Sequence, residues 1–245
     1  MKFYESQEYI SHRKSTAHHR RVHDTELVNM FFGKAVLELG CGANPQDFLG
    51  NEYVGVDISF RALRESKGRG ARILADATCL PFKNESFDAV ITIALLEHVP
   101  EPEKVLREIV RVLRIGGIVM HSDAWNVPPW RCLGLQVKPY KMLKFSYKVL
   151  KLLLPILESL PLRVLRIIPN RIIRELRKFN GLDYRPLKPN YNLPEASDAD
   201  ACVSIDSHSV LLFYKAMGFS LVKPSDRALN RLLHRGFVVV KKVKK

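Results

Sequence analysis

The sequence predicts an α/β fold built on a mostly parallel sheet. Five short apolar runs have the length and composition of strands buried on both faces: 36–39, 53–56, 71–74, 87–93 and 118–121. Turn signals and helical patterns separate these runs, and this alternation is typical of parallel sheets with helices on their faces. A parallel sheet brings the carboxyl ends of its strands to one edge. Residues that directly follow the strands are therefore expected to face a common crevice.

Composition and charge limit the class of protein. The 245 residues, 47% hydrophobic and 26% charged, are enough for one α/β domain with additional elements. The four cysteines include no C-x-x-C pair, which argues against a zinc site or a disulfide scaffold and fits a reducing cytoplasm, and no metal site is predicted. The polar first residues do not resemble a secretory signal. The net charge of +14 predicts an anionic partner: nucleic acid, a membrane surface or a phosphorylated substrate.

Residues 35–59 read as strand, glycine turn, short connector and second strand. Gly40 and Gly42 follow the first strand, where glycine lets the backbone adopt φ > 0 and approach a ligand closely. Asp57 ends the second strand and should face the same crevice. A dinucleotide site would need a third glycine where Pro45 stands, followed by a helix for which few residues remain. NAD and FAD are therefore disfavoured.

Caps and terminators predict the helices. Ser59 can cap a short helix, and Pro102 suits the first turn of a longer one. The glycine pair at 116–117 is expected to end that longer helix. The predicted helices cover 60–66, 102–113 and 207–217, and two further strands are expected at 219–223 and 236–240.

Five motifs follow one another in order between Val36 and about Asp123: ELGCG, VGVDIS, DATCLPF, FDAVI with LLEHV, and EIVRVLRIGG. This succession resembles the class I S-adenosylmethionine-dependent methyltransferases, and within them the quinone-biosynthesis and small-molecule enzymes. The C-terminal helix and strands resemble the hairpin that closes the sheet in this family. The resemblance implies a Rossmann-like, seven-stranded, mostly parallel sheet with a reversed last strand.

The resemblance also implies S-adenosylmethionine as the cofactor and gives roles to the matching positions. Gly40 and Gly42 would let the backbone pack beside the methionyl part, and Glu38 would orient that loop or the ammonium group. Asp57 would accept hydrogen bonds from the ribose hydroxyls, and Ile58 would pack on the adenine ring. The remaining implied contacts are Asp76 with the exocyclic amine, the Ala77 backbone with the ring edge, and Cys41 and Ile93 as further neighbours of the cofactor.

His98 is the candidate catalytic residue. It lies just past strand four, which in related enzymes faces the methyl group of the donor, and an imidazole there can act as a base. The alternative interpretation is a histidine that packs or caps at the start of a helix. His121, Asp123 and His208 are further candidates near strand ends, and for each of them a structural role is the more natural one.

Four parts of the chain are predicted: a helical lead-in at 1–34, a cofactor-binding core at 35–124, a basic helical insertion at 125–197, and the rest of the core at 198–245. Between Trp125 and Asn190, fourteen Lys and Arg stand against three Asp and Glu, a balance of +11. A basic amphipathic helix is expected there, kinked near Pro155, with a second helix over 162–179. The predicted apolar side of the first of these helices consists of Leu143, Tyr147, Leu150, Leu154 and Leu157, and its basic side consists of Lys141, Lys144, Lys148 and Lys151.

Three interpretations of this insertion stay open. It could be a lid over the substrate pocket, or a membrane-surface helix with its leucines among acyl chains and its lysines near anionic headgroups. RNA binding is less favoured, because stacking on bases requires exposed aromatic side chains. The sequence thus predicts methyl transfer to a small, lipid-linked or glycan-linked acceptor, with the cytoplasmic surface of a membrane as a candidate location. The alternatives are an RNA methyltransferase and a non-catalytic, membrane-associated protein that binds S-adenosylmethionine, against which the intact Asp57 and Asp76 argue.

Overall fold

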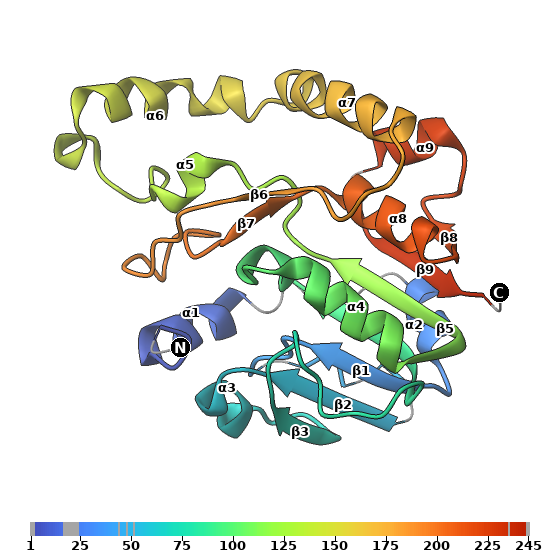
Figure 1. Ribbon diagram of the computed structural model, residues 1–245. Helices are drawn as coiled ribbons and strands as arrows, with labels where there is room; N and C mark the ends of the chain where they lie inside the picture. Colours follow the sequence, from blue (N-terminus) through green and yellow to red (C-terminus); the bar gives the residue numbers. More distant parts are fainter. Residues whose placement is uncertain are drawn as a thin grey trace.

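The computed structural model describes residues 3–16, 25–43, 45–47, 49–50, 52–234 and 236–243. Its main strands are β1 (Ala35–Leu39), β2 (Glu52–Asp57), β3 (Ala71–Leu74), β4 (Phe87–Ile93), β5 (Leu113–Ser122), β8 (Phe219–Lys223) and β9 (Val238–Lys242). They form one sheet in the order β3-β2-β1-β4-β5-β9-β8 (Figure 1). The pairs from β3 to β5 are parallel, whereas β9 is antiparallel to both of its neighbours. The predicted sheet with a reversed last strand is therefore confirmed.

Helices α4 (Pro102–Val112) and α8 (Ser207–Ala216) cover one face of this sheet, and α2 (Thr25–Phe31) covers the other. The chain also has α1 (Gln7–Thr16), α3 (Phe60–Glu65), which contacts β2 and β3, and α9 (Ala228–Leu233), which packs on α8. Ser59 caps α3 as expected, its side chain accepting a hydrogen bond from the Ala62 N–H. The larger part of the core lies between the sheet and the helices α4 and α8. A smaller cluster on the other face includes Phe31 of α2.

The central strands supply both clusters because successive side chains of a strand point to opposite faces. In β1, Leu37 and Leu39 belong to the larger cluster and Val36 to the smaller one. In β4, Val90 joins the larger cluster, whereas Ile91 joins the smaller one. All five side chains are fully buried. The continuous apolar runs in the sequence are the direct consequence of this two-sided burial.

The end of α4 differs from the prediction. The glycine pair at 116–117 does not terminate the helix, because α4 ends at Val112 and β5 begins at once with Leu113. Leu113 is the helix C-cap and has extended backbone angles, so the chain passes directly from helix into strand. Gly116, with φ of +82°, lies inside β5, where the pairing with β4 changes register. The glycines therefore allow the irregular backbone of β5 at this register shift.

Residues 125–197, called the basic segment below, contain α5 (Pro129–Cys132), a 3-10 turn (Tyr140–Met142), α6 (Phe145–Leu157) and α7 (Leu160–Leu176). Pro155 lies inside α6, which ends two residues later, and α7 follows as a separate helix. A second, two-stranded sheet of β6 (Tyr184–Pro186) and β7 (Val203–Ile205) was not predicted. Figure 1 shows α6 and α7 above this small sheet, away from β1–β3.

The predicted leucine side of α6 packs on the protein itself. Leu143 and Leu154 are buried with Leu135, and Leu150 packs against them, so the expectation that these leucines enter a bilayer is wrong. A different set is exposed, spaced along one face of the helix: Phe145 (82% exposed), Val149 (43%), Leu152 (69%) and Ile156 (58%). We call these four residues the apolar stripe. Within the described residues, none of the helices combines the length and apolar character needed to cross a bilayer.

Candidate functional site

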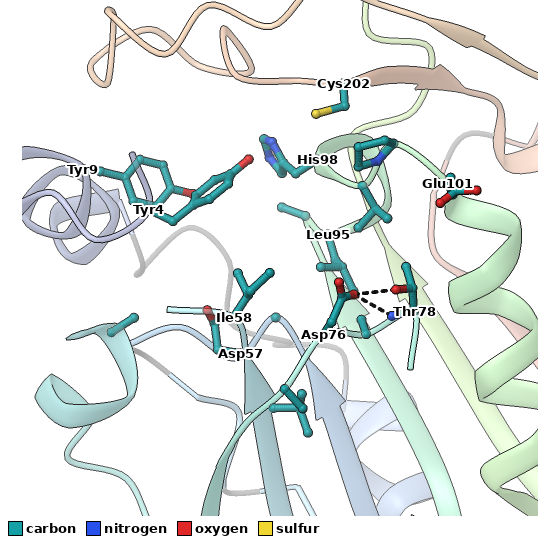
Figure 2. Close-up of a pocket in the computed structure, with 18 of the residues that line it drawn as sticks. Tyr4, Tyr9, Asp57, Ile58, Asp76, Thr78, Leu95, His98, Glu101 and Cys202 are labelled. Carbon is teal, nitrogen blue, oxygen red and sulfur yellow. Dashed lines mark hydrogen bonds between the residues drawn. The ribbon is translucent and has the colours of Figure 1, made fainter. Parts of the chain in front are cut away.

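A cavity of ≈ 400 Å³ opens at the carboxyl ends of the strands, where the sequence placed the site. Figure 2 shows Asp57, Ile58 and Asp76 on one side of this strand-end cavity, with His98 and Cys202 across from them. Residues far apart in the chain therefore meet here, because each follows a strand or packs on a strand end. A volume of this size is in the range of small-molecule sites.

The glycine turn is tied to Asp57 by backbone hydrogen bonds. The Gly40 N–H donates to the Val56 carbonyl at 2.8 Å, and the Gly42 N–H donates to Asp57 Oδ2 at 2.8 Å. Gly40 has φ of +74°, and a Cβ built on it would meet Leu95 Cδ1 at 3.0 Å. Glycine is thus required both by the backbone angle and by the close approach to the cavity wall.

Two carboxylates are held in fixed orientations at this edge. Asp57 Oδ1 accepts a hydrogen bond from the Ser59 N–H at 2.8 Å. Asp76 Oδ1 accepts from both the backbone N–H and the hydroxyl of Thr78, each at 2.8 Å. Ile58 and Ala77, the residues that follow these acids, also line the cavity. Because a carboxylate oxygen accepts more than one hydrogen bond, both acids can still accept from ligand hydroxyl or amino groups.

Glu38 lies behind the cavity and orients the loop. Its carboxylate is buried and accepts hydrogen bonds from the Gln46 N–H at 2.7 Å and from the Tyr53 hydroxyl. Burial raises the pKa of Glu38 to about 7, against the lowering effect of those hydrogen bonds. Of the two roles predicted for Glu38, loop orientation agrees with these contacts, whereas Glu38 does not line the cavity.

Cys41 and Ile93 also lie outside the cavity wall. Cys41 is buried against β2, where a Cβ on Gly55 would meet its Sγ at 2.7 Å. Ile93 packs in the smaller core cluster on the opposite face of β4. The wall at the end of β4 is made instead by Ala94 and Leu95. For Ile93 the reason is the alternation of side chains along β4, which turns it to the face away from the site.

His98 lines the cavity between two carboxylates. It belongs to a 3-10 turn (Leu96–His98) that follows β4. Its Nδ1 lies 3.2 Å from Asp200 Oδ2, and its Nε2 lies 3.7 Å from Glu97 Oε1. A carboxylate beside an imidazole fixes the orientation of the ring and stabilises the imidazolium formed when the ring accepts a proton. Both ring nitrogens are buried and lie beside these carboxylates, and the role of His98 as a base stays a prediction.

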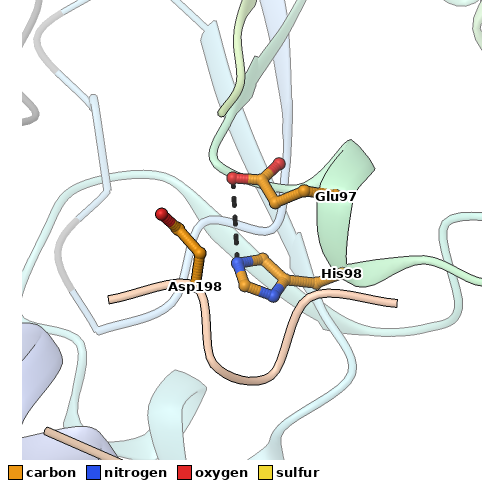
Figure 3. A group of neighbouring side chains, drawn as sticks. All are labelled: Glu97, His98 and Asp198. Carbon is orange, nitrogen blue, oxygen red and sulfur yellow. Dashed lines mark ion pairs between the residues drawn. The ribbon is translucent and has the colours of Figure 1, made fainter. Parts of the chain in front are cut away.

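Glu97, His98 and Asp198 could also hold a divalent cation. Their ligand atoms all lie within 4.8 Å of one another (Figure 3). Burial raises the pKa of Glu97 to about 7, opposed by His98 and reinforced by Asp123. Glu97 Oε1 already accepts from the Ala124 N–H at 3.1 Å. The prediction that the protein has no metal site stays untested.

The side chains of the three further catalytic candidates make hydrogen bonds within the protein and do not face the cavity. His121 is buried, with Nδ1 2.7 Å from Thr92 Oγ1 and Nε2 2.8 Å from the Tyr214 hydroxyl. Asp123 accepts hydrogen bonds from the backbone N–H groups of Leu95 and Leu96, and so holds the turn that carries His98. His208 bonds Glu175 of α7, and none of the three lines the strand-end cavity.

Aromatic residues that the sequence analysis did not single out cover the cavity. Tyr4 and Tyr9 come from the N-terminal segment and Tyr191 from the basic segment, and all three line the cavity. The ring centroids of Tyr4 and Tyr9 are 5.3 Å apart, and those of Tyr4 and Tyr191 are 6.3 Å apart. Burial raises the pKa of Tyr4 far above its ordinary value. The dense aromatic spacing of FYESQEY was the available signal, but nothing local shows that it reaches this site.

Comparisons with known proteins find similarity to methyltransferases. Residues 37–121 match the family model described as "Methyltransferase domain". A fatty-acid O-methyltransferase from Mycolicibacterium smegmatis is 33% identical over 125 residues, which are 45% of each chain. A ubiquinone biosynthesis O-methyltransferase from Aliivibrio fischeri is 27% identical over 199 residues, covering 73% of this chain and 80% of that enzyme.

A solved structure of a SAM-dependent methyltransferase from Methanosarcina mazei superposes with a TM-score of 0.51 over 92% of this chain and 100% of the other, at 15% identity. This similarity shows the fold. The chain spans less than half the length of the first curated relatives it matches, 45% in the case of the fatty-acid enzyme. Residues 37–121 therefore carry the predicted methyltransferase domain, and S-adenosylmethionine is the cofactor that this domain implies.

Proposed function

We propose that this chain, which carries a class I S-adenosylmethionine-dependent methyltransferase domain, transfers a methyl group to an oxygen of a small or lipid-linked acceptor. The observation that carries the proposal is the strand-end cavity, where Asp57 and Asp76 lie across from His98. The first two residues serve the cofactor and the third serves the acceptor. Both reactants can thus be held in one cavity.

The residues at the strand ends fit the cofactor. Asp57 would accept from the ribose hydroxyls, and Asp76 from the exocyclic amine of the adenine. Gly40 leaves room beside the cavity that a Cβ would fill, since such an atom would meet Leu95 at 3.0 Å. When bound, S-adenosylmethionine supplies an activated methyl group, so the protein mainly has to position the acceptor.

His98 would remove the proton of the acceptor. A hydroxyl acceptor must lose its proton as the new carbon–oxygen bond forms, and His98 can take it while Asp200 stabilises the resulting charge. The aromatic cover from Tyr4, Tyr9 and Tyr191 would exclude water and pack against an apolar or aromatic acceptor. Two relatives named for O-methylation, of fatty acids and in ubiquinone biosynthesis, favour such acceptors.

The apolar stripe of α6 would place the enzyme at an anionic membrane surface. Phe145, Val149, Leu152 and Ile156 are exposed on one face, and Lys144 and Lys148 are the residues directly before the first two. An exposed apolar stripe beside cationic side chains is the pattern of a helix lying in the bilayer interface. A lipid-linked acceptor would be met there, on the predicted cytoplasmic side. RNA as the acceptor stays the alternative prediction.

Titration calorimetry with S-adenosylmethionine and its demethylated product tests the central claim. Asp57→Ala should weaken binding by on the order of 1–3 kcal/mol, through the loss of charge-assisted hydrogen bonds. Glu52→Gln, at the amino end of the same strand, is the matched control and should bind as the wild type does. Absence of heat with both ligands would contradict the proposal.

Turnover tests the assigned base. Fatty acids and reduced quinones in anionic vesicles are the first acceptors to assay. His98→Ala should lower the rate by roughly 10²–10⁴-fold and flatten its rise with pH, while the cofactor affinity stays unchanged. An unchanged rate would show that His98 is not the base and that its role is structural.

A further inference from the structure

We propose a second ligand site, for a phosphate-bearing molecule, in the cavity between α7 and the small sheet. This cavity has a volume of ≈ 470 Å³ and shares no lining residue with the strand-end cavity. Four arginines line it, and we call it the arginine cavity: Arg163, Arg166 and Arg174 from α7, and Arg185 from β6. The proposal does not depend on methyl transfer.

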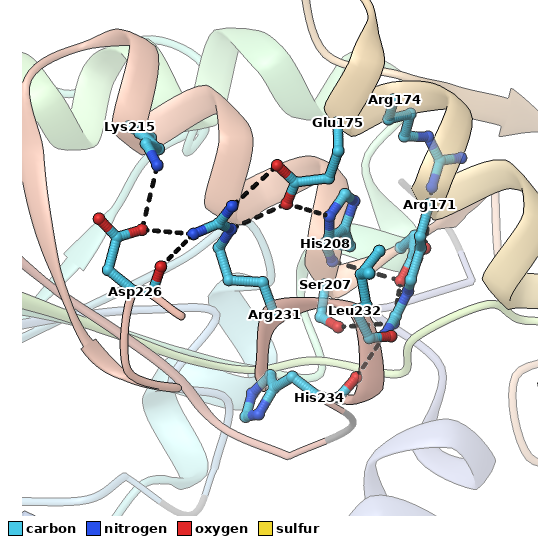
Figure 4. Close-up of polar contacts among 11 residues, drawn as sticks. Arg171, Arg174, Glu175, Ser207, His208, Lys215, Asp226, Arg231, Leu232 and His234 are labelled. Carbon is cyan, nitrogen blue, oxygen red and sulfur yellow. Dashed lines mark hydrogen bonds and ion pairs between the residues drawn. The ribbon is translucent and has the colours of Figure 1, made fainter. Parts of the chain in front are cut away.

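The spacing of the α7 arginines explains why they reach one cavity. Arg163, Arg166, Asn170 and Arg174 follow each other at intervals of three or four residues, so they share one face of the helix. Arg171 belongs to a different face and is buried in a polar network (Figure 4). The arginines of this helix, which look alike in the sequence, thus divide into a structural one and a set that lines a cavity.

The charges in the cavity do not cancel. Its two acids are Asp183 and Asp206. Arg174 pairs with both, at 2.5 Å and 2.8 Å, and Arg171 also bonds Asp206. Arg163, Arg166 and Arg185 have no ion pair with any acidic side chain in the part of the chain that the structure describes. The cavity therefore has a net positive charge, which favours the binding of an anion.

Part of this charge is held in place before any ligand binds. The Arg166 guanidinium lies over the Trp130 ring, 5.3 Å from its centroid. Trp130 is fixed in turn, because its Nε1 donates to Glu158 Oε1 at 3.0 Å. Arg185 sits on β6, paired in register with Ser204 of β7. A planar guanidinium held by stacking loses little freedom when it binds a phosphate, which favours arginine-rich sites for such ligands.

The neutral lining residues also suit a phosphate ester. Ser204 and Asn170 line the cavity and carry hydrogen-bond donors, although the Asn170 amide already donates to the Arg166 carbonyl at 3.4 Å. Trp130 and Tyr184 also line it and offer flat surfaces to an attached organic group. The phosphate could belong to a soluble molecule or to a lipid headgroup. The chemistry recognised is the same, namely one or two phosphate groups with a neighbouring apolar or ring-bearing part.

The test is calorimetric titration of the full chain with inorganic diphosphate and with dihexanoyl phosphatidic acid below its micelle concentration. Arg163→Gln with Arg185→Gln should weaken binding by about tenfold or more. Arg177→Gln with Lys178→Gln removes the same charge from the exposed residues that follow α7, and should change binding by less than about threefold. Unchanged thermal unfolding of both double variants would show that the fold is intact.

The two ligands separate the sources of the phosphate. Binding of both, lost in the cavity variant, assigns the site to phosphate groups in general, whereas binding of the lipid alone assigns it to a headgroup. Either result supports the site. It would be overturned if neither ligand bound at millimolar concentration, or if the cavity variant and the matched control lost affinity equally.

Discussion

The two helices of the basic segment are attached to the protein by different means. Helix α7 is anchored by buried charge: Arg171 Nε donates to Asp206 Oδ2 at 2.9 Å, and Arg171 Nη1 donates to the carbonyls of Leu232 and His234 (Figure 4). Helix α6 rests on a small apolar cluster around Leu135 and leaves its apolar stripe exposed. The comparison shows that similar runs of basic and aliphatic residues can either anchor a helix to the protein or leave an apolar face of a helix exposed to solvent.

The difference has an energetic reason. Removing a buried guanidinium from its partners leaves a carboxylate uncompensated in a region of low dielectric constant. The contacts of α6 are mostly those of a small apolar cluster, and its Lys151 donates to the Lys138 carbonyl at 2.6 Å. Such partly exposed contacts contribute little to stability. We therefore expect α7 to behave as part of the core and α6 as a peripheral element.

The largest expected effect is on stability, from Arg171→Met. The free energy of unfolding should fall by about 3 kcal/mol, the low end for a broken buried pair, because Arg174 and Asn126 still contact Asp206. Urea denaturation measures the change. Arg177→Met, an exposed arginine just after the same helix, should stay within about 0.5 kcal/mol of the wild type. Equal effects of both substitutions would mean that α7 is not anchored in this way.

The next effect is on membrane binding and concerns α6 alone. Phe145→Ser with Leu152→Ser should reduce co-sedimentation with anionic vesicles by about tenfold or more and leave unfolding unchanged, because these side chains are 82% and 69% exposed. Leu229→Ser on α9, where the leucine is 64% exposed, is the matched control. Wild-type protein that ignored anionic vesicles would refute membrane docking, and a strong loss from the control would refute the assignment to α6.

The smallest effect is the response of the α7 anchor to acid. The hydrogen bonds from Arg231 lower the pKa of Glu175 from 4.5 to about 2, with His208 acting in the same direction. A lowered carboxyl pKa contributes stability above the unfolded value, and this contribution is lost as the pH falls from about 4.5 towards 2. The difference in unfolding free energy between wild type and Glu175→Gln should therefore shrink over that interval, by under about 1 kcal/mol because Glu175 is half-buried. A difference that stayed constant with pH would contradict the assignment.

Local signals were sufficient for most of the sheet and for the cofactor half of the site. Asp57 and Asp76 could be placed because each follows an apolar strand, and parallel strands bring such residues together. The glycine pair at 116–117 misled the prediction, since glycine is equally suited to a helix end and to an irregular strand.

The other half of the site depends on contacts between distant parts of the chain. Tyr4 of the N-terminal segment, Tyr191 of the basic segment and Asp200, just after that segment, come together around His98. No periodic pattern in the sequence indicates this packing. Likewise, the helical wheel of α6 identified an amphipathic helix but not which side the protein covers. Leu154 is buried and Leu152 is exposed, because the cluster around Leu135 packs on the Leu154 side of the helix.

The aromatic cover of the cavity affects where the chain can be truncated without loss of the site. Phe3 and Tyr191 have ring centroids 5.1 Å apart, and Tyr4 and Tyr9 belong to the same group. None of these residues is in the seven-stranded sheet. A shortened chain without its first sixteen residues keeps every strand yet loses one wall of the cavity. Good expression and a cooperative melt are therefore no guide to a complete site, and the boundaries of a functional fragment must be chosen by the wall of the cavity.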